Sequence, residues 1–409
     1  MRHLSQPHSS SASWAAALLG FLTLEMVITS CAGSENDVGA RESDTDGGSA
    51  SDATADANDG ACEGDCDACG SSDGLPCSDV EWTVVNTNHP GGVGLSSVWG
   101  SGPNDVWAVG AAGSAIHWDG KDWTPVPVAT GWSLQAIWGT GPNDVWTVSS
   151  PNLIFHTTGF ANGTAQWSPV TPIWDSSNSS DQGRRLLRTI WGTSPNDIWI
   201  GGDSSLERPP SYVRESGWRS IITDGGTGWA PISIFANHQI KAIWGSGPGD
   251  IWLVGSQGIG ISFAAHTNGV AAADGGLPVW TEIDTQSLPI LHAVWGSGPG
   301  DVWTVGDYGT IRHFVAGAEV WSVVDSPTTE SLRGLWGAGP DDIWAVGENG
   351  TILHYDGTAW RTSTGAFPPG KKPHLFSVWG SGPSDVWAVG SGVVLHFSGS
   401  KSGARGANR

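Results

Sequence analysis

Two residue types recur in the sequence at places where they could carry out chemistry. The aspartates follow one another at a nearly constant interval: Asp105, Asp144, Asp197, Asp250, Asp301, Asp342 and Asp385. The histidines recur at a second place in the same interval: His117, His156, His313, His354 and His396. Carboxylates and imidazoles gathered in a ring could bind a metal ion or transfer protons. Each Asp, however, directly follows a turn, where a carboxylate can accept backbone N–H groups that would otherwise be unpaired. We therefore predict structural roles for both sets, with no metal and no cofactor.

Four cysteines form a second candidate centre near the start of the chain: Cys62, Cys66, Cys69 and Cys77. As thiolates, four cysteines at this spacing could bind zinc. In an exported protein two disulfides are expected instead, with a connectivity that spacing alone does not determine. The neighbouring segment 56–60 lacks the ligand spacing and the distal Glu of a calcium-binding loop, which argues against calcium.

The first residues have the pattern of an export signal. Residues 1–30 contain basic residues and then an apolar run, Trp14–Ile28, that is too short for a membrane span. The run ends in Val-Ile-Thr-Ser-Cys, which resembles a bacterial lipobox. This resemblance implies a lipoprotein signal peptide, lipidation of Cys31 and, because Ala32 follows, an outer-membrane location. An ordinary cleaved signal is the alternative, and both interpretations predict an exported protein.

Residues 31–78 are predicted to form an acidic, flexible tether that includes the Cys-rich segment 62–77. Its Ser, Asp, Ala and Gly residues cannot bury enough apolar surface to offset the loss of chain entropy on folding. The whole chain carries a net charge of −22. Such acidity disfavours nucleic acid, because binding phosphates requires Lys and Arg. The partners predicted from this part of the chain are a membrane, through the lipid, and no nucleic acid.

The aspartates belong to an internal repeat that determines the predicted fold. The string VWGSGPNDVWAVG at Val98–Gly110 returns six more times with small changes. The first Trp of each copy is Trp99, Trp138, Trp191, Trp244, Trp295, Trp336 or Trp379. The interval of about 47 residues is typical of one four-stranded propeller blade. With 60 Gly, 24 Pro and 26 Trp and no long helical pattern, the chain is predicted to be all-β.

The number of strands predicts how the ring closes. Each repeat contains four strand patterns, and the last of them carries a Trp at 82, 123, 167, 218, 280, 321 or 360. Trp82 precedes the first complete repeat, whereas the last repeat, ending at 393–397, has no fourth strand after it. We therefore expect a monomeric, seven-bladed β-propeller of four-stranded antiparallel blades over residues 79–398. Residues 81–85 are expected to complete the last blade, which removes open sheet edges. Residues 399–409 are expected to form a flexible tail.

The repeat resembles two known groups of propellers. The units that carry the resemblance include Leu335-Trp336-Gly337, Gly350–His354, and Asp356-Gly357 followed by Trp360. They look like the photosystem II assembly-factor type of propeller and like the degenerate Asp-box repeats of sialidase-like propellers. The first resemblance implies a non-catalytic binding or assembly scaffold, which we favour. The second leaves a carbohydrate-active enzyme as an alternative, although Tyr212, Tyr308 and Tyr355 lack the companions of a sialidase site. A purely structural envelope protein is a third possibility.

Departures from the repeat predict where a ligand binds. Three additional Trp residues occupy what we interpret as loops between a fourth strand and the next first strand: Trp132, Trp174 and Trp229. Polar and basic residues gather at the starts of the first strands: Gln135, Arg184, Arg185, Arg188, Lys241, His292 and Arg333. Antiparallel alternation places both sets at the same end of the ring. We predict a binding face over blades two to four for a peptide, a protein or an anionic glycan. The alternative is that these Trp residues pack against their own loops.

Overall fold

The computed structural model describes residues 81–87, 93–170, 186–203, 216–223, 226–232, 238–258, 260–269, 278–367, 370 and 372–399. All of them belong to one compact unit, Cys62–Arg409. The predicted signal peptide, tether and tail, with Cys31 and the four clustered cysteines, lie outside the described residues, as do Trp174, Arg184 and Arg185. Within the described part, no helix has the length and apolar character needed to cross a membrane.

The strands form successive antiparallel blades, numbered here in chain order. Blade 1 contains β2 (Leu95–Gly102), β3 (Asp105–Gly110), β4 (Ala115–Trp118) and β5 (Trp123–Pro125). Blade 2 contains β6 (Leu134–Gly141), β7 (Asp144–Ser149), β8 (Leu153–Thr157) and β11 (Ser168–Val170), with a hairpin of β9 (Phe160–Ala161) and β10 (Thr164–Ala165) before β11. Blade 3 contains β12 (Leu186–Ser194), β13 (Asp197–Asp203), β14 (Gly217–Thr223) and β15 (Gly226–Pro231).

The remaining blades follow the same order. Blade 4 contains β16 (His238–Gly247), β17 (Asp250–Gln257), β18 (Ile261–Thr267) and β19 (Thr281–Glu282), and one residue pair, Asp203 and Gln239, joins its sheet to blade 3. Blade 5 contains β20 (Leu291–Gly298), β21 (Asp301–Gly306), β22 (Ile311–Val315) and β23 (Ser322–Val324). Blade 6 contains β24 (Leu332–Gly339), β25 (Asp342–Gly347), β26 (Ile352–Tyr355) and β27 (Trp360–Thr362). Blade 7 contains β28 (Leu375–Gly382), β29 (Asp385–Gly390), β30 (Val393–Phe397) and β1 (Thr83–Val84). Single turns of 3-10 helix follow β3, β21 and β25: η3 (Ala111–Gly113), η4 (Asp307–Gly309) and η5 (Glu348–Gly350).

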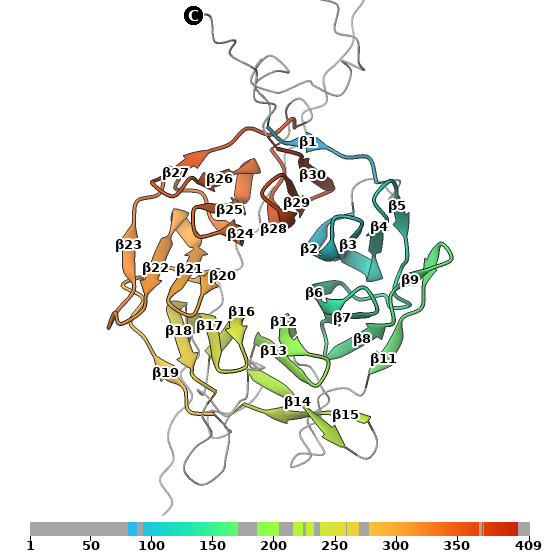
Figure 1. Ribbon diagram of the computed structural model, residues 1–409, viewed down its shortest axis with the longest axis horizontal. Coiled ribbons are helices and arrows are strands. Elements are labelled where there is room, and N and C mark those ends of the chain that lie inside the picture. Colours follow the sequence, from blue (N-terminus) through green and yellow to red (C-terminus); the bar gives the residue numbers. More distant parts are fainter. Residues whose placement is uncertain are drawn as a thin grey trace, which may run out of the picture. The chain divides into compact units, whose positions relative to one another are not determined.

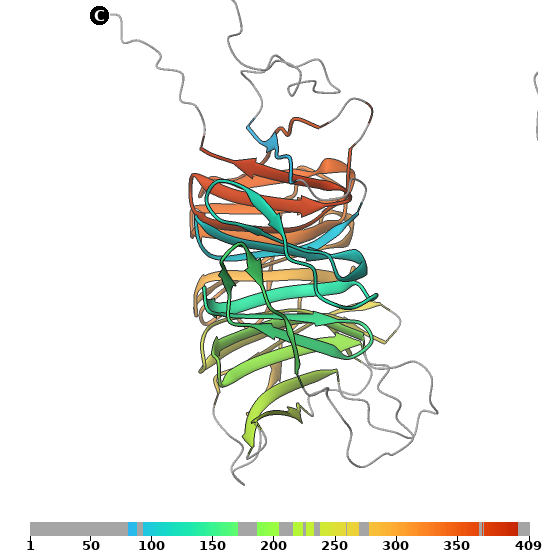
Figure 2. The same ribbon diagram turned by 90° about the vertical axis from the view of Figure 1, so that its right-hand side faces the viewer.

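The blades surround a central opening, and the first strand of each blade lines it (Figure 1). Viewed from the edge, the strands run between two faces of the ring (Figure 2). Because neighbouring strands are antiparallel, the second-to-third and blade-to-blade connections lie on one face, which we call the loop face. The first-to-second and third-to-fourth connections lie on the other, which we call the Asp face because each repeat Asp begins a second strand there.

Tryptophan and glycine pack between neighbouring blades all the way around the ring. A Cβ atom added to Gly139 would lie 2.7 Å from Cη2 of Trp99, so only glycine fits beneath that indole. The same contact occurs at Gly192, Gly245, Gly296, Gly337 and Gly380, each against the Trp of the preceding blade. It also joins the last blade to the first, because a Cβ on Gly100 would lie 2.6 Å from Cη2 of Trp379. The repeated Trp-Gly pair therefore encodes blade packing and ring closure.

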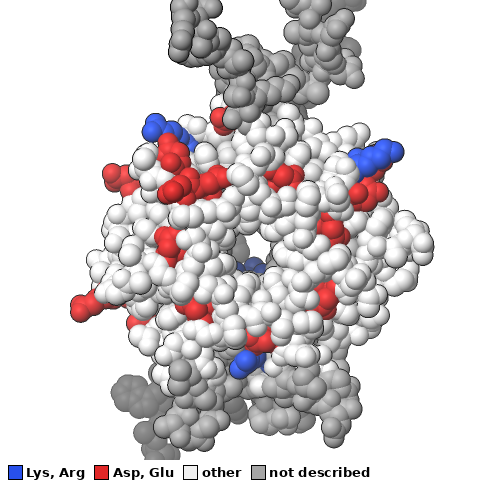
Figure 3. All heavy atoms as spheres, viewed as in Figure 1, with Lys and Arg blue, Asp and Glu red and all other residues white. Residues whose placement is uncertain are grey.

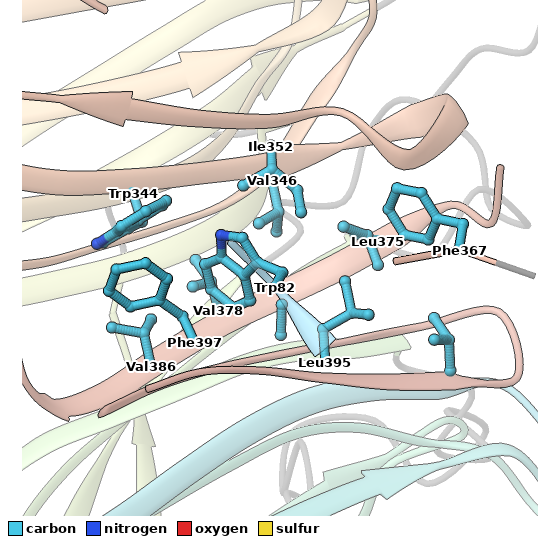
Figure 4. Close-up of a cluster of buried hydrophobic side chains, with 12 residues drawn as sticks. Trp82, Trp344, Val346, Ile352, Phe367, Leu375, Val378, Val386, Leu395 and Phe397 are labelled. Atoms are coloured by element: carbon cyan, nitrogen blue, oxygen red, sulfur yellow. The ribbon is translucent and has the colours of Figure 1, made fainter. Parts of the chain in front are cut away.

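The N-terminal strand β1 completes blade 7, as the strand count predicts. It pairs antiparallel with β30 through Thr83 with His396 and Val84 with Leu395. Trp82, directly before β1, is fully buried and meets Trp344 edge to face, with ring centroids 5.1 Å apart. Figure 4 shows its indole among side chains of blades 6 and 7. The start of the chain thus joins the last two blades.

The structure corrects the predicted strand assignment in blade 3. Trp218 was expected in the fourth strand and Trp229 in the loop after it. Trp218 instead lies in β14, which pairs with β13 and is the third strand, whereas Trp229 lies in β15, opposite Ser220. The prediction was wrong here because the chain between Asp203 and Gly217 is longer than in other blades, which moves both outer strands later in the sequence.

Candidate functional site

The repeat aspartates form hydrogen bonds within their own blades. In blade 1 the Oδ1 atom of Asp105 accepts a hydrogen bond of 2.9 Å from Nε1 of Trp107 and lies 2.7 Å from Nε2 of His117. Its Oδ2 atom accepts a hydrogen bond of 2.6 Å from the Ser101 hydroxyl. Equivalent partners surround Asp144, Asp250, Asp301 and Asp385. These bonds tie the first, second and third strands together, which is a structural role.

Blades 3 and 4 show how the pattern tolerates change. In blade 3, Arg219 takes the place of the His: its Nε donates to Oδ1 of Asp197 at 2.8 Å, and its guanidinium lies 4.9 Å from the ring centre of Trp199. In blade 4, His266 occupies the repeated position. It was not predicted from the sequence because it follows the repeat Asp by 16 residues, whereas His117 follows Asp105 by 12. Among the described residues, no group of three or more His, Cys, Asp or Glu is arranged to hold a metal ion.

Hydrogen bonding lowers the pKa of three of these carboxylates, which favours their ionised form. Burial acts to raise the pKa of Asp105, but the hydrogen bonds from His117 and Ser101 lower it more, so the pKa lies below its usual value. The pKa values of Asp250 and Asp385 are lowered by the same balance. A carboxylate with a lowered pKa is a poor general acid at neutral pH.

The basic residues of the loop face are paired with acids. Arg188 donates from Nε and Nη2 to Oδ2 of Asp203 at 2.7 and 2.6 Å, and Nζ of Lys241 lies 3.3 Å from Oδ1 of the same carboxylate. Burial lowers the pKa of Lys241, although the nearby Asp203 acts to raise it. The acid lies here because an antiparallel hairpin brings the end of its second strand beside the start of its first.

A second charged cluster lies on blades 5 and 6. Nε2 of His292 lies 2.8 Å from Oδ1 of Asp307 and 2.6 Å from Nη1 of Arg333, whose Nη2 donates to Glu348. Burial, with the positive charge of Arg333, lowers the pKa of His292, so the imidazole is neutral at pH 7. Figure 3 shows Lys or Arg atoms inside the central opening.

The basic residues predicted at this end of the ring, among those that the structure describes, lie beside carboxylates. Three cationic side chains and three carboxylates balance one another there: Arg188, Lys241, Arg333, Asp203, Asp307 and Glu348. These acids were not predicted as part of the site, although each stands at the end of a second strand or directly after one. The paired clusters form a polar surface.

The predicted Trp and Gln residues differ in their surroundings. Trp132 is 56% exposed on the connection between blades 1 and 2. Trp229 is partly buried and packs against the core cluster that includes Trp138 and Trp218. Gln135 is half-buried on β6. The structure therefore leaves Trp132 exposed, and it gives Trp229 a packing role in a strand rather than in a loop.

An apolar patch that the sequence analysis missed lies on the loop face of blades 4 and 5. It consists of Ile261, Leu288 and Tyr308, which are 51%, 74% and 77% exposed. Two backbone hydrogen bonds bring their segments together: the N–H of Ser262 donates to Leu288, and the N–H of Asp307 donates to Ile290. Tyr308 has a φ of 56° in η4, a left-handed conformation that is uncommon for such a residue. An aromatic residue in a turn position was the sequence signal available for this patch.

Side chains hold the loop of this patch in place. Arg312 donates from Nε to the carbonyl of Thr285 at 3.0 Å and from Nη2 to the carbonyl of Gln286 at 2.7 Å. The hydroxyls of Ser262 and Thr285 lie 2.6 Å apart. A loop that is ordered before binding loses less conformational entropy when a ligand arrives.

Solved structures of other proteins share this architecture. No family model and no curated protein matches the chain. A solved structure of YCF48 bound to a D1 peptide aligns with a TM-score of 0.59 and 17% identity, over 78% of this chain and 97% of that one. The chain shares the β-propeller fold. The WD40 propeller domain of Doa1 aligns with a TM-score of 0.57 and 12% identity, over 79% of this chain and 98% of that one. Streptogramin B lyase aligns with a TM-score of 0.57 and 14% identity, over 77% and 96%. Because this one fold serves proteins with different roles, the likeness informs on architecture, and function must be argued from the site.

Proposed function

We propose that this chain is a non-catalytic scaffold that binds a peptide or a protein segment at the apolar patch on its loop face. The observation that carries the proposal is that Ile261, Leu288 and Tyr308, each more than half exposed, lie on segments joined by backbone hydrogen bonds. Single exposed apolar residues are normal on a protein surface, whereas adjacent ones beside polar groups are typical of interaction sites.

The surroundings of the patch support a peptide rather than an anionic glycan. Asp307, adjacent to Tyr308, belongs to the charged cluster with His292 and Arg333, so a polar rim lies beside the apolar centre. Interfaces commonly combine an aromatic anchor with such a rim. The balanced charges offer an anionic sugar no net attraction. A peptide complex of YCF48, a structural neighbour, supports the same choice of ligand.

The proposed cellular setting comes from the sequence. Export, lipidation of Cys31 and a tether over residues 31–78 would display a monomeric propeller at the cell envelope, most simply at the outer membrane. Mass spectrometry of the mature protein tests this part directly. We expect an N-terminal diacylglycerol-modified Cys31, and an unmodified N-terminus elsewhere would contradict it.

The ligand class can be tested with a random peptide library displayed on phage and selected on the purified chain. Selected peptides are then measured against Leu288→Ala and Tyr308→Ala, with Val323→Ala as the control. Val323 is 64% exposed on the outer strand of blade 5 and lies outside the patch. Removing an aromatic anchor should weaken binding by about tenfold or more, whereas the control should bind like the parent chain. If no peptide is selected, or if only the control variant loses affinity, the proposal is wrong.

A further inference from the structure

A cavity lies on the Asp face at the seam between blades 6 and 7, away from the apolar patch. Its volume is about 390 Å³, which is within the range of roughly 300–1,000 Å³ for pockets that bind small molecules. Its lining includes His354, Asp341 and Asp356 from blade 6 and Phe397 and Gly399 from blade 7. The cavity therefore has the size to accept one small ring-shaped molecule.

The imidazole of His354 is the flat surface of this cavity. It stacks on Trp344, with ring centroids 4.1 Å apart and an angle of 18° between the ring planes. Its Nε2 atom lies 2.7 Å from Oδ1 of Asp342, so two neighbours hold the ring in place. The side chain is nevertheless 34% exposed. A ligand in the cavity can therefore reach an aromatic surface whose orientation is already fixed.

The seam between blades 1 and 2 shows what kind of group covers such a surface. His117 is the equivalent of His354, because it pairs with Trp107 across two strands as His354 pairs with Trp344. There the ring of Phe160 stacks on the imidazole, with centroids 4.1 Å apart and an angle of 24°. With this cover, His117 is only 3% exposed. At this seam the chain thus fills the equivalent place with an aromatic ring of its own.

The segment that follows blade 7 contains no such ring. Phe160 directly follows Gly159, which has a φ of 102° and stands three residues after the repeat His of blade 2. Gly399 has a φ of 88° and stands at the same place in blade 7. Residues 400–409, which lie outside the described part of the chain, include no Phe, Trp, Tyr or His. They therefore leave the exposed surface of His354 to a ring from another molecule.

The charge of the lining selects among aromatic molecules. Asp341, Asp342 and Asp356 line the cavity, whereas no Lys or Arg does so among the described residues. Asp356 pairs with Arg361 at 2.9 Å, so three carboxylates share one guanidinium. Hydrogen bonds, foremost from Thr358, lower the pKa of Asp356, which favours its ionised form. An ammonium group is attracted to this lining, and a carboxylate is repelled.

We propose that this cavity binds a small aromatic amine, whose ring stacks on His354 as Phe160 stacks on His117. Its ammonium group is attracted by the carboxylates of the lining, foremost Asp341 and Asp356. This site is independent of the peptide surface on the loop face.

Isothermal titration calorimetry on the full chain tests the class of ligand with three probes. Phenethylamine carries a ring and an ammonium group, cyclohexylethylamine has the same charge without an aromatic ring, and phenylpropionate has the ring with a carboxylate. We expect phenethylamine to bind about fivefold more tightly than cyclohexylethylamine, because stacked aromatic rings attract each other beyond the area that they bury. Phenylpropionate should bind at least about tenfold more weakly than phenethylamine, because its charge is repelled.

Substitutions of His354 test the stacking itself. His354→Ala should weaken phenethylamine binding by about fivefold, because the flat surface is lost. His354→Phe loses the contact with Asp342 but keeps an aromatic ring, so its affinity should stay within about twofold of that of the parent chain. His396→Ala is the matched control and should bind like the parent. His396 stacks on Trp387 at 4.0 Å and lies 2.7 Å from Asp385, but it is not part of the lining of this cavity.

Four results would overturn the proposal. They are no heat of binding at millimolar phenethylamine, equal affinity for cyclohexylethylamine, equal affinity of His354→Ala and His396→Ala, and binding by His354→Phe that is as weak as by His354→Ala. Because the Asp face and the loop face are tested with separate probes, either proposal can fail alone.

Discussion

Replacing Trp82 by Ala tests whether the start of the chain holds the ring closed. The indole is fully buried and contacts residues of both blade 6 and blade 7. Its backbone carbonyl accepts a hydrogen bond of 2.8 Å from Ala366, and the N–H of Val85 donates to Val394 at 2.9 Å, so the segment is held on both sides. A substitution that empties this position therefore loosens two blades at once.

The magnitude follows from the buried area. A Trp side chain buries about 150–250 Å², which at about 25 cal/mol per Å² corresponds to roughly 4–6 kcal/mol. Measured Trp or Phe to Ala substitutions in cores cost about 3–5 kcal/mol. The edge-to-face contact with Trp344 belongs to the same loss. We expect the free energy of unfolding to fall by about 4 kcal/mol.

Urea titration followed by far-ultraviolet circular dichroism measures this free energy without relying on the fluorescence of many other Trp residues. Trp123→Ala is the matched comparison, because Trp123 is 2% exposed at the equivalent place in blade 1 and should cost a similar amount. Trp132→Ala is the control, because a side chain that is 56% exposed should cost less than about 1 kcal/mol. If Trp82→Ala behaves like Trp132→Ala, the N-terminal strand does not close blade 7 and the reasoning fails.

Two further predictions concern the repeat itself. Gly100→Ala should lower the free energy of unfolding by about 1–3 kcal/mol, because the new Cβ would lie 2.6 Å from Cη2 of Trp379. Gly102→Ala is the control and should change stability little, because its Cβ would meet no atom within 4 Å. Thermal melts of the two variants test this, and equal melting temperatures would contradict the packing argument. Acid should destabilise the ring: burial acts to raise the pKa of Asp385, but hydrogen bonds, foremost from His396, lower it below the usual 3.8 in the folded state. The resulting stabilisation is complete above pH 3.8 and is lost as the pH falls through the lower, folded-state pKa. The melting temperature should therefore decrease once the pH is below about 4. A constant melting temperature from pH 5 to pH 2 would contradict this prediction.

The sequence by itself was sufficient for the architecture of the ring. Strand alternation, turn residues and the Trp-Gly pair are local patterns, and each copy carries them complete. The early position of Trp82 and the missing strand after Phe397 even predicted the closure of blade 7, because a ring must return to its own start. The repeat Asp was expected to accept backbone N–H groups, whereas the partners of Asp105 are side chains of the same blade.

Only the tertiary structure decided where ligands could bind. Ile261 begins β18, Leu288 lies in the connection between blades 4 and 5, and Tyr308 lies in η4. Their proximity therefore depends on how blades 4 and 5 pack. Blade 3 was misassigned because a long connection has no periodic pattern to mark where its strands resume. Local sequence patterns predict contacts within one blade. A surface formed between two blades depends on the distance between those blades, which no single repeat encodes.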